Sequence, residues 1–278
     1  MLDKVVVMTG ATSGIGAVAA EKLAAMSARI VFIARDRVRG AAMEARLREL
    51  APGRSHRVFY ADLSLVSEAR RVGAEIAAAE PRIDVLINNA GALFGKREIT
   101  AEGLEFTFAT NHMSHFVLTN ALRESLLASA SARVINTSSE AHRGARVDFD
   151  DLQFALSFGG MKAYRRSKLC NILFTRQLAR QLAGTRVTAN SLHPGFVNTR
   201  FADGTKGAWR YMFRFAKNFG ISPEKGAETI VFLASAKEVA AVTGEYFFQC
   251  RTMTPSREAR VDDSARRLWE ESQKLAAV

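Results

Sequence analysis

The chain has 278 residues, 48% of them hydrophobic and 24% charged, which is enough for one α/β domain with a substantial core and leaves little room for a second. Its formal net charge of +11 would draw it towards anionic surfaces such as lipid head groups, phosphorylated ligands or nucleic acid. The lysines and arginines are spread along the sequence rather than gathered in one block, which favours a solvated basic surface and no specific nucleic-acid partner.

The N-terminal segment predicts a cytoplasmic protein. Residues 1–4 lead directly into an apolar strand, without the charged, apolar and small-residue regions of a signal peptide, and we expect no bilayer-spanning helix. The two cysteines, Cys170 in a helical stretch and Cys250 at the end of an apparent strand, lack the spacing of a zinc site and are too few for a disulfide framework. We expect both to be reduced packing residues.

Short apolar runs rich in β-branched residues predict about seven strands: Val5–Val7, Arg29–Ala34, Val58–Ala61, Val85–Ile87, Val134–Asn136, Val187–Leu192 and Glu245–Phe248. Longer stretches with helical spacing lie between most of them: Val18–Met26, Ala41–Leu50, Ala69–Ala79 and Leu169–Leu182. This alternation predicts an α/β fold, a single-domain Rossmann-type doubly wound parallel sheet with helices on both faces and right-handed crossovers. The domain would span residues 1–278, with a substrate lid at 199–222 and a C-terminal helix at 256–276.

The first strand runs into a glycine-rich turn, Thr9–Gly16, that opens a helix. In a dinucleotide site one glycine permits the tight turn, one lets the backbone approach the pyrophosphate, and one lets the helix pack closely on the strand. The phosphates then lie at the helix N-terminus, where unpaired N–H groups favour negative charge. Three glycines could also form an ordinary strand-to-helix turn, but the strand before and the helix after favour nucleotide binding.

The end of the second strand bears on the choice of cofactor. A carboxylate there would bind the ribose hydroxyls of NAD, but the strand ends Ala34-Arg35-Asp36. With Ala34 in the usual acidic position, no carboxylate repels a 2′-phosphate, and the Arg35 guanidinium can pair with it. This favours NADP(H). In the alternative, Arg35 is solvated and Asp36 binds the ribose.

Tyr164 and Lys168 lie four residues apart in a predicted helix, on one face and about one turn apart. A tyrosine of ordinary pKa near 10 is a poor base at neutral pH. A neighbouring ammonium stabilises the phenolate and lowers that pKa, as general acid/base catalysis requires. Such a pair is more often structural, so its significance depends on the residues near it.

Other polar residues are expected at the same edge of the sheet. One strand ends in Thr137-Ser138-Ser139 and another in Asn88–Gly91, and ligands of doubly wound sheets lie beyond the carboxyl ends of the strands. Asn111 follows in an amphipathic helical stretch. These signals converge with Tyr164 on one site.

With these motifs the chain resembles the short-chain dehydrogenase/reductase family over nearly its whole length, and within it the retinol-dehydrogenase-like subgroup. Thr9–Gly16 matches T-G-x-x-x-G-x-G, Asn88–Gly91 matches N-N-A-G, Tyr164–Lys168 matches Y-x-x-x-K, and His193-Pro194-Gly195 with Thr199 matches P-G-x-x-x-T. The cofactor-binding residues that the resemblance implies are Gly10, Thr12, Ser13, Gly14, Ile15, Gly16, Arg35, Asp62, Leu63, Asn89, Ala90, Gly91, Tyr164, Lys168, Pro194, Gly195, Val197 and Thr199.

The resemblance also implies the catalytic roles. Tyr164 would exchange a proton with the substrate oxygen while the nicotinamide exchanges a hydride with the carbon. Lys168 would lower the tyrosine pKa and hold the nicotinamide ribose. Ser139 would orient the carbonyl, with Ser138 as the competing serine, and Asn111 would anchor a water that links Lys168 to solvent.

The interval from Ser139 to Tyr164 is 164 − 139 = 25 positions, longer than in most of the family. The resemblance to the retinol-dehydrogenase-like subgroup explains the inserted stretch, Arg143–Gly160, as a loop near the substrate mouth.

In the lid, Lys206–Phe219 alternates large apolar residues with cations. This pattern is found in a helix that rests on a membrane or closes over an apolar substrate, and also in an ordinary amphipathic helix. Each possibility favours a lipophilic alcohol or carbonyl substrate, and peripheral membrane contact stays open.

The histidines predict no metal site. The five histidines are His56, His112, His115, His142 and His193. His112 and His115 have i, i+3 spacing, but no third ligand is evident, so helix-surface or core packing explains the histidines better.

The leading function is an NADP(H)-dependent dehydrogenase or reductase. Reduction of a C=C bond or epimerisation on the same fold is a second possibility, and a non-catalytic nucleotide sensor is a third. Family analogy suggests a homodimer or homotetramer built on the helices that carry Asn111 and Tyr164.

Overall fold

The computed structural model describes residues 1–196 and 221–277, so Val197, Thr199 and the lid segment Lys206–Phe219 lie outside the described residues. One sheet of eight strands runs through the described chain in the order β3-β2-β1-β4-β5-β6-β7-β8. Its strands are β1 Val5–Thr9, β2 Arg29–Ala34, β3 Arg57–Tyr60, β4 Val85–Asn88, β5 Ala132–Thr137, β6 Val187–Leu192, β7 Tyr246–Phe248 and β8 Arg251–Thr252. All pair in parallel except β8, which is antiparallel to β7. The predicted doubly wound α/β fold is confirmed.

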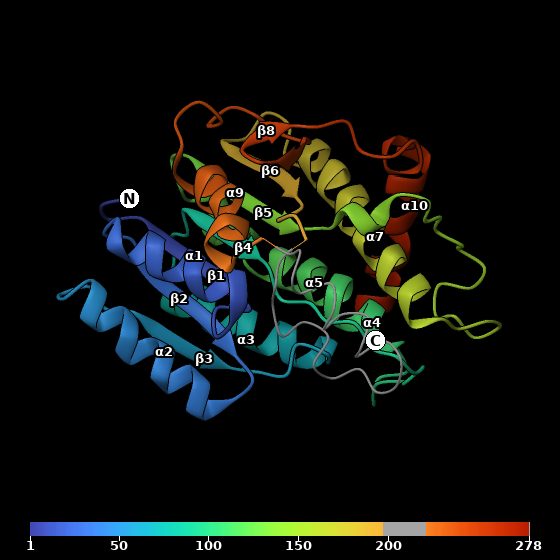
Figure 1. Ribbon diagram of the computed structural model, residues 1–278, viewed down its shortest axis with the longest axis horizontal. Helices are drawn as coiled ribbons and strands as arrows, with labels where there is room; N and C mark the ends of the chain where they lie inside the picture. The colour runs from blue at the N-terminus through green and yellow to red at the C-terminus, as the bar shows by residue number, and fades with distance from the viewer. Residues whose placement is uncertain (197–220, 278) are drawn as a thin grey trace.

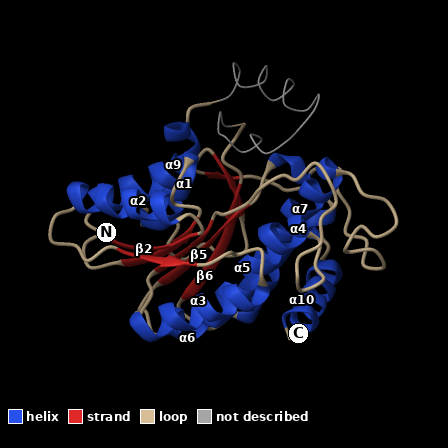
Figure 2. Ribbon diagram, turned by 90° about the horizontal axis from the view of Figure 1, so that it is seen from below, coloured by secondary structure: helices blue, strands red, loops and turns tan. Residues whose placement is uncertain are grey.

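Helices cover both faces of the sheet, as Figures 1 and 2 show. On one face lie α1, α2 and α9, and on the other α3, α5, α6 and α7. The helices are α1 Gly14–Ala25, α2 Arg37–Leu50, α3 Val66–Ala79, α4 Phe106–Phe108, the π-helical turn η1 Ala109–Met113, α5 Ser114–Ala121, α6 Arg123–Leu127, the 3₁₀ turn η2 Glu140–His142, α7 Gly160–Gln181, α9 Pro223–Ser235, the 3₁₀ turn η5 Glu258–Arg260 and α10 Asp262–Ala276.

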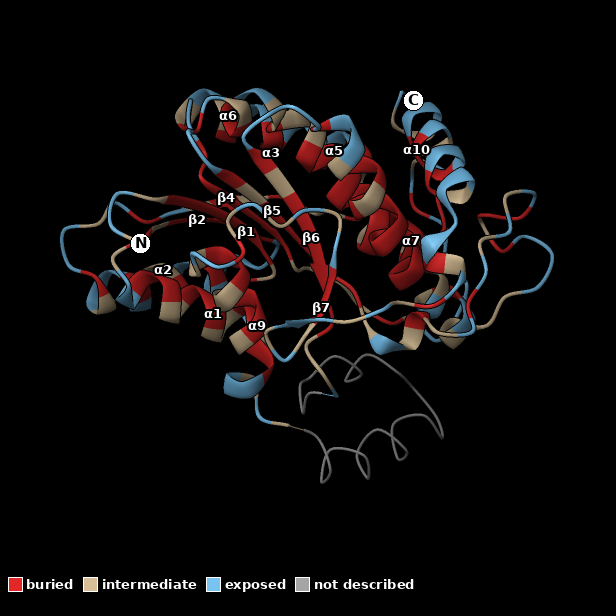
Figure 3. Ribbon diagram, turned by 90° about the horizontal axis from the view of Figure 1, so that it is seen from above, coloured by how far each residue is buried: buried red, intermediate tan, exposed pale blue. Residues whose placement is uncertain are grey.

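Alternation along the first strand explains the two layers. Val5 and Val7 face the core shared with α3, α5 and α7, whereas Val6 and Met8 face the core shared with α1, α2 and α9. Every residue of β1 is buried, as expected of a parallel strand covered on both faces. Figure 3 shows the buried sheet between helices whose outer sides are exposed.

Most predicted elements are found with their ends shifted by a few residues, and two segments near the C-terminus differ in kind from the sequence prediction. The chain turns back after β7 through Gln249 and Cys250, both with positive φ, and forms the short exposed strand β8. Cys250 is therefore a half-buried turn residue rather than the end of a strand, while Cys170 is fully buried in α7. The C-terminal helix begins at Asp262 and not at 256, because Glu258–Arg260 forms a separate 3₁₀ turn.

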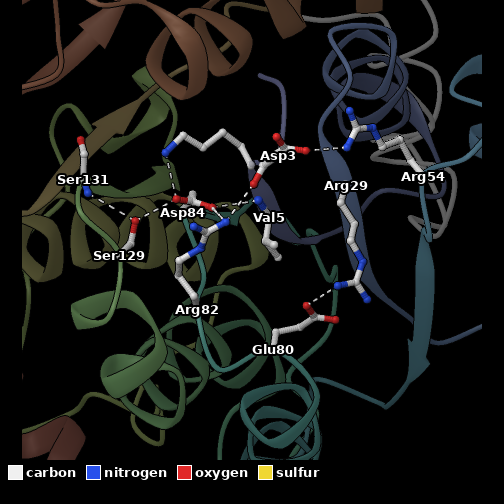
Figure 4. A network of polar contacts seen from close by, with 10 residues as sticks. Asp3, Val5, Arg29, Arg54, Glu80, Arg82, Asp84, Ser129 and Ser131 are labelled. Atoms are coloured by element: carbon white, nitrogen blue, oxygen red, sulfur yellow. Dashed lines mark hydrogen bonds and ion pairs between the residues drawn. The ribbon is translucent and has the colours of Figure 1, made fainter.

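Buried charge fixes the amino-terminal edge of the sheet, opposite the candidate site. The Asp84 carboxylate accepts hydrogen bonds from Lys4 Nζ at 3.0 Å, Val5 N at 3.0 Å and Ser129 Oγ at 2.8 Å (Figure 4). Burial works to raise the Asp84 pKa, but these bonds outweigh it and lower the pKa. The network thus ties the starts of β1 and β4 together without taking part in the site.

The C-terminal helix α10 lies along α7, as Figures 1 and 3 show. Trp269 stacks on Phe174 of α7 with ring centroids 5.9 Å apart and meets Phe116 of α5 edge-on at 5.0 Å. Ser272 Oγ is 2.9 Å from His112 Nε2. Helix α10 therefore packs against part of the two helices on which we expected subunits to meet. Among the described residues, no helix is long and apolar enough to cross a membrane.

Candidate active site

The glycine loop lies where β1 and β4 diverge to opposite halves of the sheet, the crevice in which doubly wound sheets bind nucleotides. Gly10 and Gly14 have φ of 71° and 54°, values that favour glycine. A Cβ on Gly16 would lie 2.0 Å from Gly10 O, so only glycine lets α1 approach the strand this closely. At the start of α1, Ser13 makes no side-chain capping bond and the first turn holds no acidic residue. The loop therefore fits a pyrophosphate.

At the end of β2 the Arg35 side chain is exposed, whereas the Asp36 carboxylate is engaged by the protein. Ala34 is buried and Arg35 exposed. Asp36 Oδ1 accepts a hydrogen bond from Arg39 N at 3.0 Å and caps α2, which lowers the Asp36 pKa. Because its carboxylate is used as a helix cap, Asp36 is poorly placed to bind a ribose, and the geometry favours Arg35 over this alternative. Farther along the edge, Asp62 Oδ1 accepts bonds from Ser64 N and Oγ at 3.0 and 2.8 Å, and Leu63 packs partly buried against the core.

Hydrogen bonds join the N-N-A-G segment to the glycine loop. Thr9 Oγ1 accepts from Asn89 N at 3.0 Å and Ala90 N at 2.9 Å. Asn88 is fully buried and donates to Asn136 Oδ1 at 2.8 Å on the neighbouring strand β5. Thr9 and Asn88 thus hold the ends of β1, β4 and β5 in register around the crevice.

Asn111 and Lys168 flank the glycine of that segment. A Cβ on Gly91 would lie 3.1 Å from Lys168 Nζ and 3.2 Å from Asn111 Oδ1. Asn111 lies in the π-helical turn η1, exchanges two hydrogen bonds with the Ala92 main chain at 2.8 and 2.9 Å, and donates to Ser167 Oγ at 3.0 Å. Its side chain is therefore engaged by protein groups, and the expected water link from Asn111 to Lys168 stays a prediction.

Tyr164 and Lys168 lie one turn apart in α7, with Lys168 Nζ 5.6 Å from the centre of the tyrosine ring. Lys168 is buried and donates to Thr137 O at 3.2 Å. Burial lowers the pKa of Lys168 to about 8. Burial also raises the pKa of Tyr164 to about 12, against a hydrogen bond with Ser139 that lowers it. Burial outweighs that hydrogen bond, so Tyr164 is protonated at neutral pH. The lowering of its pKa by Lys168 stays a prediction.

The two serines after β5 have different surroundings. Ser138 is buried and donates its hydroxyl to Lys168 O at 2.7 Å. Ser139 is partly exposed beside Tyr164, and its Oγ accepts from Ala141 N at 3.1 Å. With one lone pair taken by a backbone N–H, the Ser139 hydroxyl can still donate to a substrate oxygen. The geometry therefore favours Ser139 as the serine that meets the substrate.

The adjacent strand β6 ends in His193-Pro194-Gly195, next to the end of β5. His193 Nδ1 accepts from Gly195 N at 3.1 Å, and Gly195 has a φ of 91°. The His193 ring stacks on Phe248 with centroids 4.0 Å apart. This turn brings Pro194 and Gly195 to the same edge as the other site residues.

Polar residues that the sequence analysis did not assign to the site support it from behind. His115 Nε2 is 2.9 Å from Ala90 O, and its Nδ1 is 3.4 Å from Asn171 Nδ2. Asn171 also donates to Thr137 O at 3.1 Å, the carbonyl that Lys168 binds. His115 follows Asn111 by four positions and Asn171 follows Lys168 by three, so helical spacing was the available signal.

The inserted stretch lies against the start of α7. Arg165 Nη2 donates to Arg143 O at 2.6 Å, and Arg166 Nη1 to Asp151 O at 2.6 Å. A Cβ on Gly160 would lie 2.3 Å from Phe94 O, so the first turn of α7 rests on the loop after β4.

The described residues contain no group of three or more histidine, cysteine, aspartate or glutamate side chains that could hold a metal ion.

Known proteins match this arrangement. A model of the short chain dehydrogenase family matches residues 4–208. Retinol dehydrogenase 13 of Homo sapiens is 37% identical over 99% of this chain and 85% of its own length. The crystal structure of a protein from Mycobacterium paratuberculosis has a TM-score of 0.81 at 31% identity and covers 100% of this chain and 94% of its own. A variant of actinorhodin polyketide ketoreductase, solved with NADPH, has a TM-score of 0.68 at 26% identity and covers 89% and 97% of the two chains.

Proposed function

The chain belongs to the short-chain dehydrogenase family and is similar to its retinol dehydrogenases, and on that premise we propose that it is an NADPH-dependent reductase of lipophilic aldehydes or ketones. Membership of the family supports an oxidoreductase that acts on alcohol or carbonyl groups. The cofactor preference, the roles of the residues and the substrate class are the proposal. The observation that carries it is the meeting of Tyr164, Lys168 and Ser139 at the carboxyl edge of the sheet, beside the glycine loop.

In the proposed reaction the nicotinamide, when bound, supplies a hydride to the carbonyl carbon. Tyr164 donates its phenolic proton to the carbonyl oxygen, so that one hydride and one proton convert the carbonyl to an alcohol. Because the Tyr164 pKa is about 12 in this structure, the proton to be donated is present at neutral pH. This is the protonation state that carbonyl reduction requires of the acid.

Ser139 and Lys168 would stabilise the charge that develops during this transfer. The Ser139 hydroxyl donates to the carbonyl oxygen and orients it towards Tyr164. The Lys168 ammonium stabilises the phenolate left behind and hydrogen-bonds the nicotinamide ribose. Asn111 holds the Ala92 main chain beside Lys168, and thereby fixes the wall of the cofactor site.

Two observations support NADPH over NADH. Asp36 is used as the cap of α2 while Arg35 is exposed beside the small side chain of Ala34. The polyketide ketoreductase similar to this chain was solved with NADPH. An arginine in this place offers a charge-assisted, bidentate bond to the 2′-phosphate.

A lipophilic substrate is supported by the relatives. The retinol dehydrogenases named among the relatives suggest a long apolar alcohol or aldehyde.

The test is to follow NADPH absorbance with a series of long-chain and aromatic aldehydes. We expect turnover that Tyr164→Phe lowers at least 1,000-fold, about 4 kcal/mol of transition-state stabilisation, while NADPH binding stays within twofold. Ser138→Ala serves as the matched control for Ser139→Ala, and only the Ser139 variant should lose kcat strongly. Full activity of Tyr164→Phe would refute the proposed chemistry.

A further inference from the structure

A buried histidine lies behind the candidate catalytic serine, and both of its ring nitrogens are engaged. His142 ends the 3₁₀ turn η2 that directly follows Ser139, and it is fully buried. Its Nδ1 lies 2.7 Å from Ser139 O and its Nε2 lies 3.0 Å from Ser256 N. The backbone N–H of Ser256 can only donate, so Nε2 must be the nitrogen that accepts. The ring hydrogen is therefore on Nδ1 and is donated to Ser139 O.

This bond holds the corner of the chain that presents the Ser139 hydroxyl. Ser139 O also accepts from His142 N at 3.1 Å, and Ser139 Oγ accepts from Ala141 N at 3.1 Å. Together these contacts fix both the carbonyl and one lone pair of the hydroxyl. The remaining O–H direction is then towards Tyr164 and the substrate.

The other side of the ring is held by the segment 253–261, which we term the C-terminal strap. Met253 N donates to Tyr246 O at 2.8 Å, and Arg143 Nη2 donates to Thr254 O at 2.9 Å. The ring of Tyr246 meets that of His142 edge-on with centroids 5.1 Å apart. The strap continues into α10, which packs on α7. His142 thus hydrogen-bonds both the main chain of Ser139 and this strap.

We propose that His142 is a positioning residue that sets the Ser139 hydroxyl through a neutral ring of a single tautomer, and that it couples this serine to the C-terminal strap. The inference rests on the proposed function, because it requires Ser139 to orient the carbonyl. His142 does not itself exchange a proton with the substrate, since both nitrogens are occupied by backbone groups. Loss of the Nδ1 bond leaves Ser139 free to rotate away, and a displacement of about 1 Å lowers kcat by about 100-fold.

The first experiment compares two replacements that each keep one of the two ring positions. In His142→Asn the side-chain amide can still donate to Ser139 O, whereas His142→Gln places its amide nearer Ser256. We expect kcat of the Asn variant within about fivefold of the original protein. The Gln variant should lose at least 20-fold in kcat with little change in KM and with NADPH affinity within twofold. Equal kcat for both variants, or a parallel loss of NADPH affinity, overturns the proposal.

The control is His56→Gln, which replaces another buried histidine that accepts one backbone bond, from Ile30 N at 3.1 Å, at the opposite edge of the sheet. It should lower the melting temperature without changing kcat. Failure of the proposed function is seen separately: if the original protein reduces no aldehyde, or Tyr164→Phe is fully active, the function itself is wrong and the inference falls with it. If turnover requires Tyr164 but neither His142 variant affects it, only the inference falls.

A spectroscopic measurement tests the tautomer in the original protein, with one variant used only to assign the signals. In protein labelled with ¹⁵N-histidine, the His142 signals are assigned as those missing from His142→Asn. We expect a protonated Nδ1 and an unprotonated Nε2 between pH 6 and 8. A protonated Nε2 would overturn the hydrogen-bond assignment and the proposal with it.

Discussion

At the scale of single residues, Lys168 and Tyr164 carry opposite effects of burial. Burial lowers the pKa of Lys168 to about 8, so that the ammonium loses its proton more readily, and raises the pKa of Tyr164 to about 12, so that the phenol keeps its proton. Carbonyl reduction needs the tyrosine protonated and the lysine charged. Both conditions hold at neutral pH.

The pH profile of reduction follows from these two values. As pH rises through about 8, Lys168 loses its proton and the phenolate left by Tyr164 loses its stabilising cation, so we expect kcat to be level below pH 8 and to fall above it. The measurement is kcat at saturating NADPH from pH 6 to 10. Lys168→Arg, whose guanidinium stays charged, should move any remaining fall to higher pH. A kcat that rises through pH 8 would contradict this assignment.

We propose that cofactor preference depends on Arg35. Arg35→Ala removes a charge-assisted bond to phosphate, so we expect the NADPH Kd to rise at least tenfold, about 1.4 kcal/mol, and the NADH Kd to change less than twofold. Fluorescence titration of the nicotinamide measures both. Arg48→Ala, an exposed arginine at the other end of α2 that pairs with Glu44, is the control for loss of surface charge. Unchanged NADPH affinity in Arg35→Ala would mean that a residue other than Arg35 binds the 2′-phosphate of the ribose.

At the scale of elements, the positions of the strands were the part that the sequence predicted well. Runs of β-branched residues locate buried parallel strands because both faces are covered, and the polar residues that follow them lie at one edge. Strand β8 escaped prediction because its two residues are exposed and its pairing depends on a turn at Gln249 and Cys250 with positive φ. The start of α10 was misplaced because Glu258–Arg260 is helical in periodicity but forms a separate turn.

Two adjacent glycines test the contact between α7 and the loop after β4. A Cβ on Gly160 would lie 2.3 Å from the Phe94 carbonyl oxygen, whereas a Cβ on Gly159 would meet nothing nearer than the Lys162 side chain at 3.5 Å. We expect Gly160→Ala to lower the free energy of unfolding by about 1–3 kcal/mol and to raise the substrate KM, because the turn before Tyr164 must move. Gly159→Ala is the matched control. Equal urea midpoints for the two variants would show that the loop adjusts freely.

The aromatic contact of α10 can be tested in the same way. Trp269→Ala removes the contacts of the indole ring with Phe174 and Phe116. We therefore expect the free energy of unfolding to fall by about 3–5 kcal/mol. Glu270→Ala, at the exposed neighbour that pairs with Arg266, should change it by no more than about 0.5 kcal/mol. Urea unfolding measures both, and sedimentation shows whether the uncovered face of α7 then associates. Equal stability of the variants would mean that α10 packs loosely.

At the scale of the whole molecule, contacts between distant segments are what the sequence could not predict. His142 meets Ser256 across 114 positions and His112 meets Ser272 across 160. No local periodicity records such pairs, because each arises only when the C-terminal strap and α10 fold back over α7. The histidines, interpreted from the sequence as surface or core residues, prove to be buried groups with particular hydrogen-bond partners.

These buried histidines predict acid sensitivity of the whole fold. Burial lowers the pKa of His112 to about 4, of His115 to about 3 and of His193 to about 4. Between these values and the ordinary 6.5, the unfolded chain binds protons that the folded chain does not. The stability that these neutral histidines contribute is complete above pH 6.5. It is lost as the pH falls from 6.5 through the pKa values of the folded state, at up to about 1.4 kcal/mol per pH unit for each histidine.

We therefore expect the free energy of unfolding in urea to be lower at pH 5 than at pH 7 by a few kcal/mol. His112→Gln removes one titrating group while keeping a partner for Ser272, and it should make the pH dependence shallower. Equal stability at the two pH values would contradict the burial of neutral histidines.

The most direct test of the central claim is where the hydride goes. A single turnover with NADPH carrying deuterium at both C4 positions of the nicotinamide and a lipophilic unsaturated aldehyde is analysed by NMR and mass spectrometry. We predict one deuterium on the carbinol carbon of the alcohol, and no labelled alcohol with Tyr164→Phe. Deuterium on a carbon of the former C=C bond would establish double-bond reduction instead, and an unchanged aldehyde with NADPH bound would contradict the assignment of this protein as a carbonyl reductase.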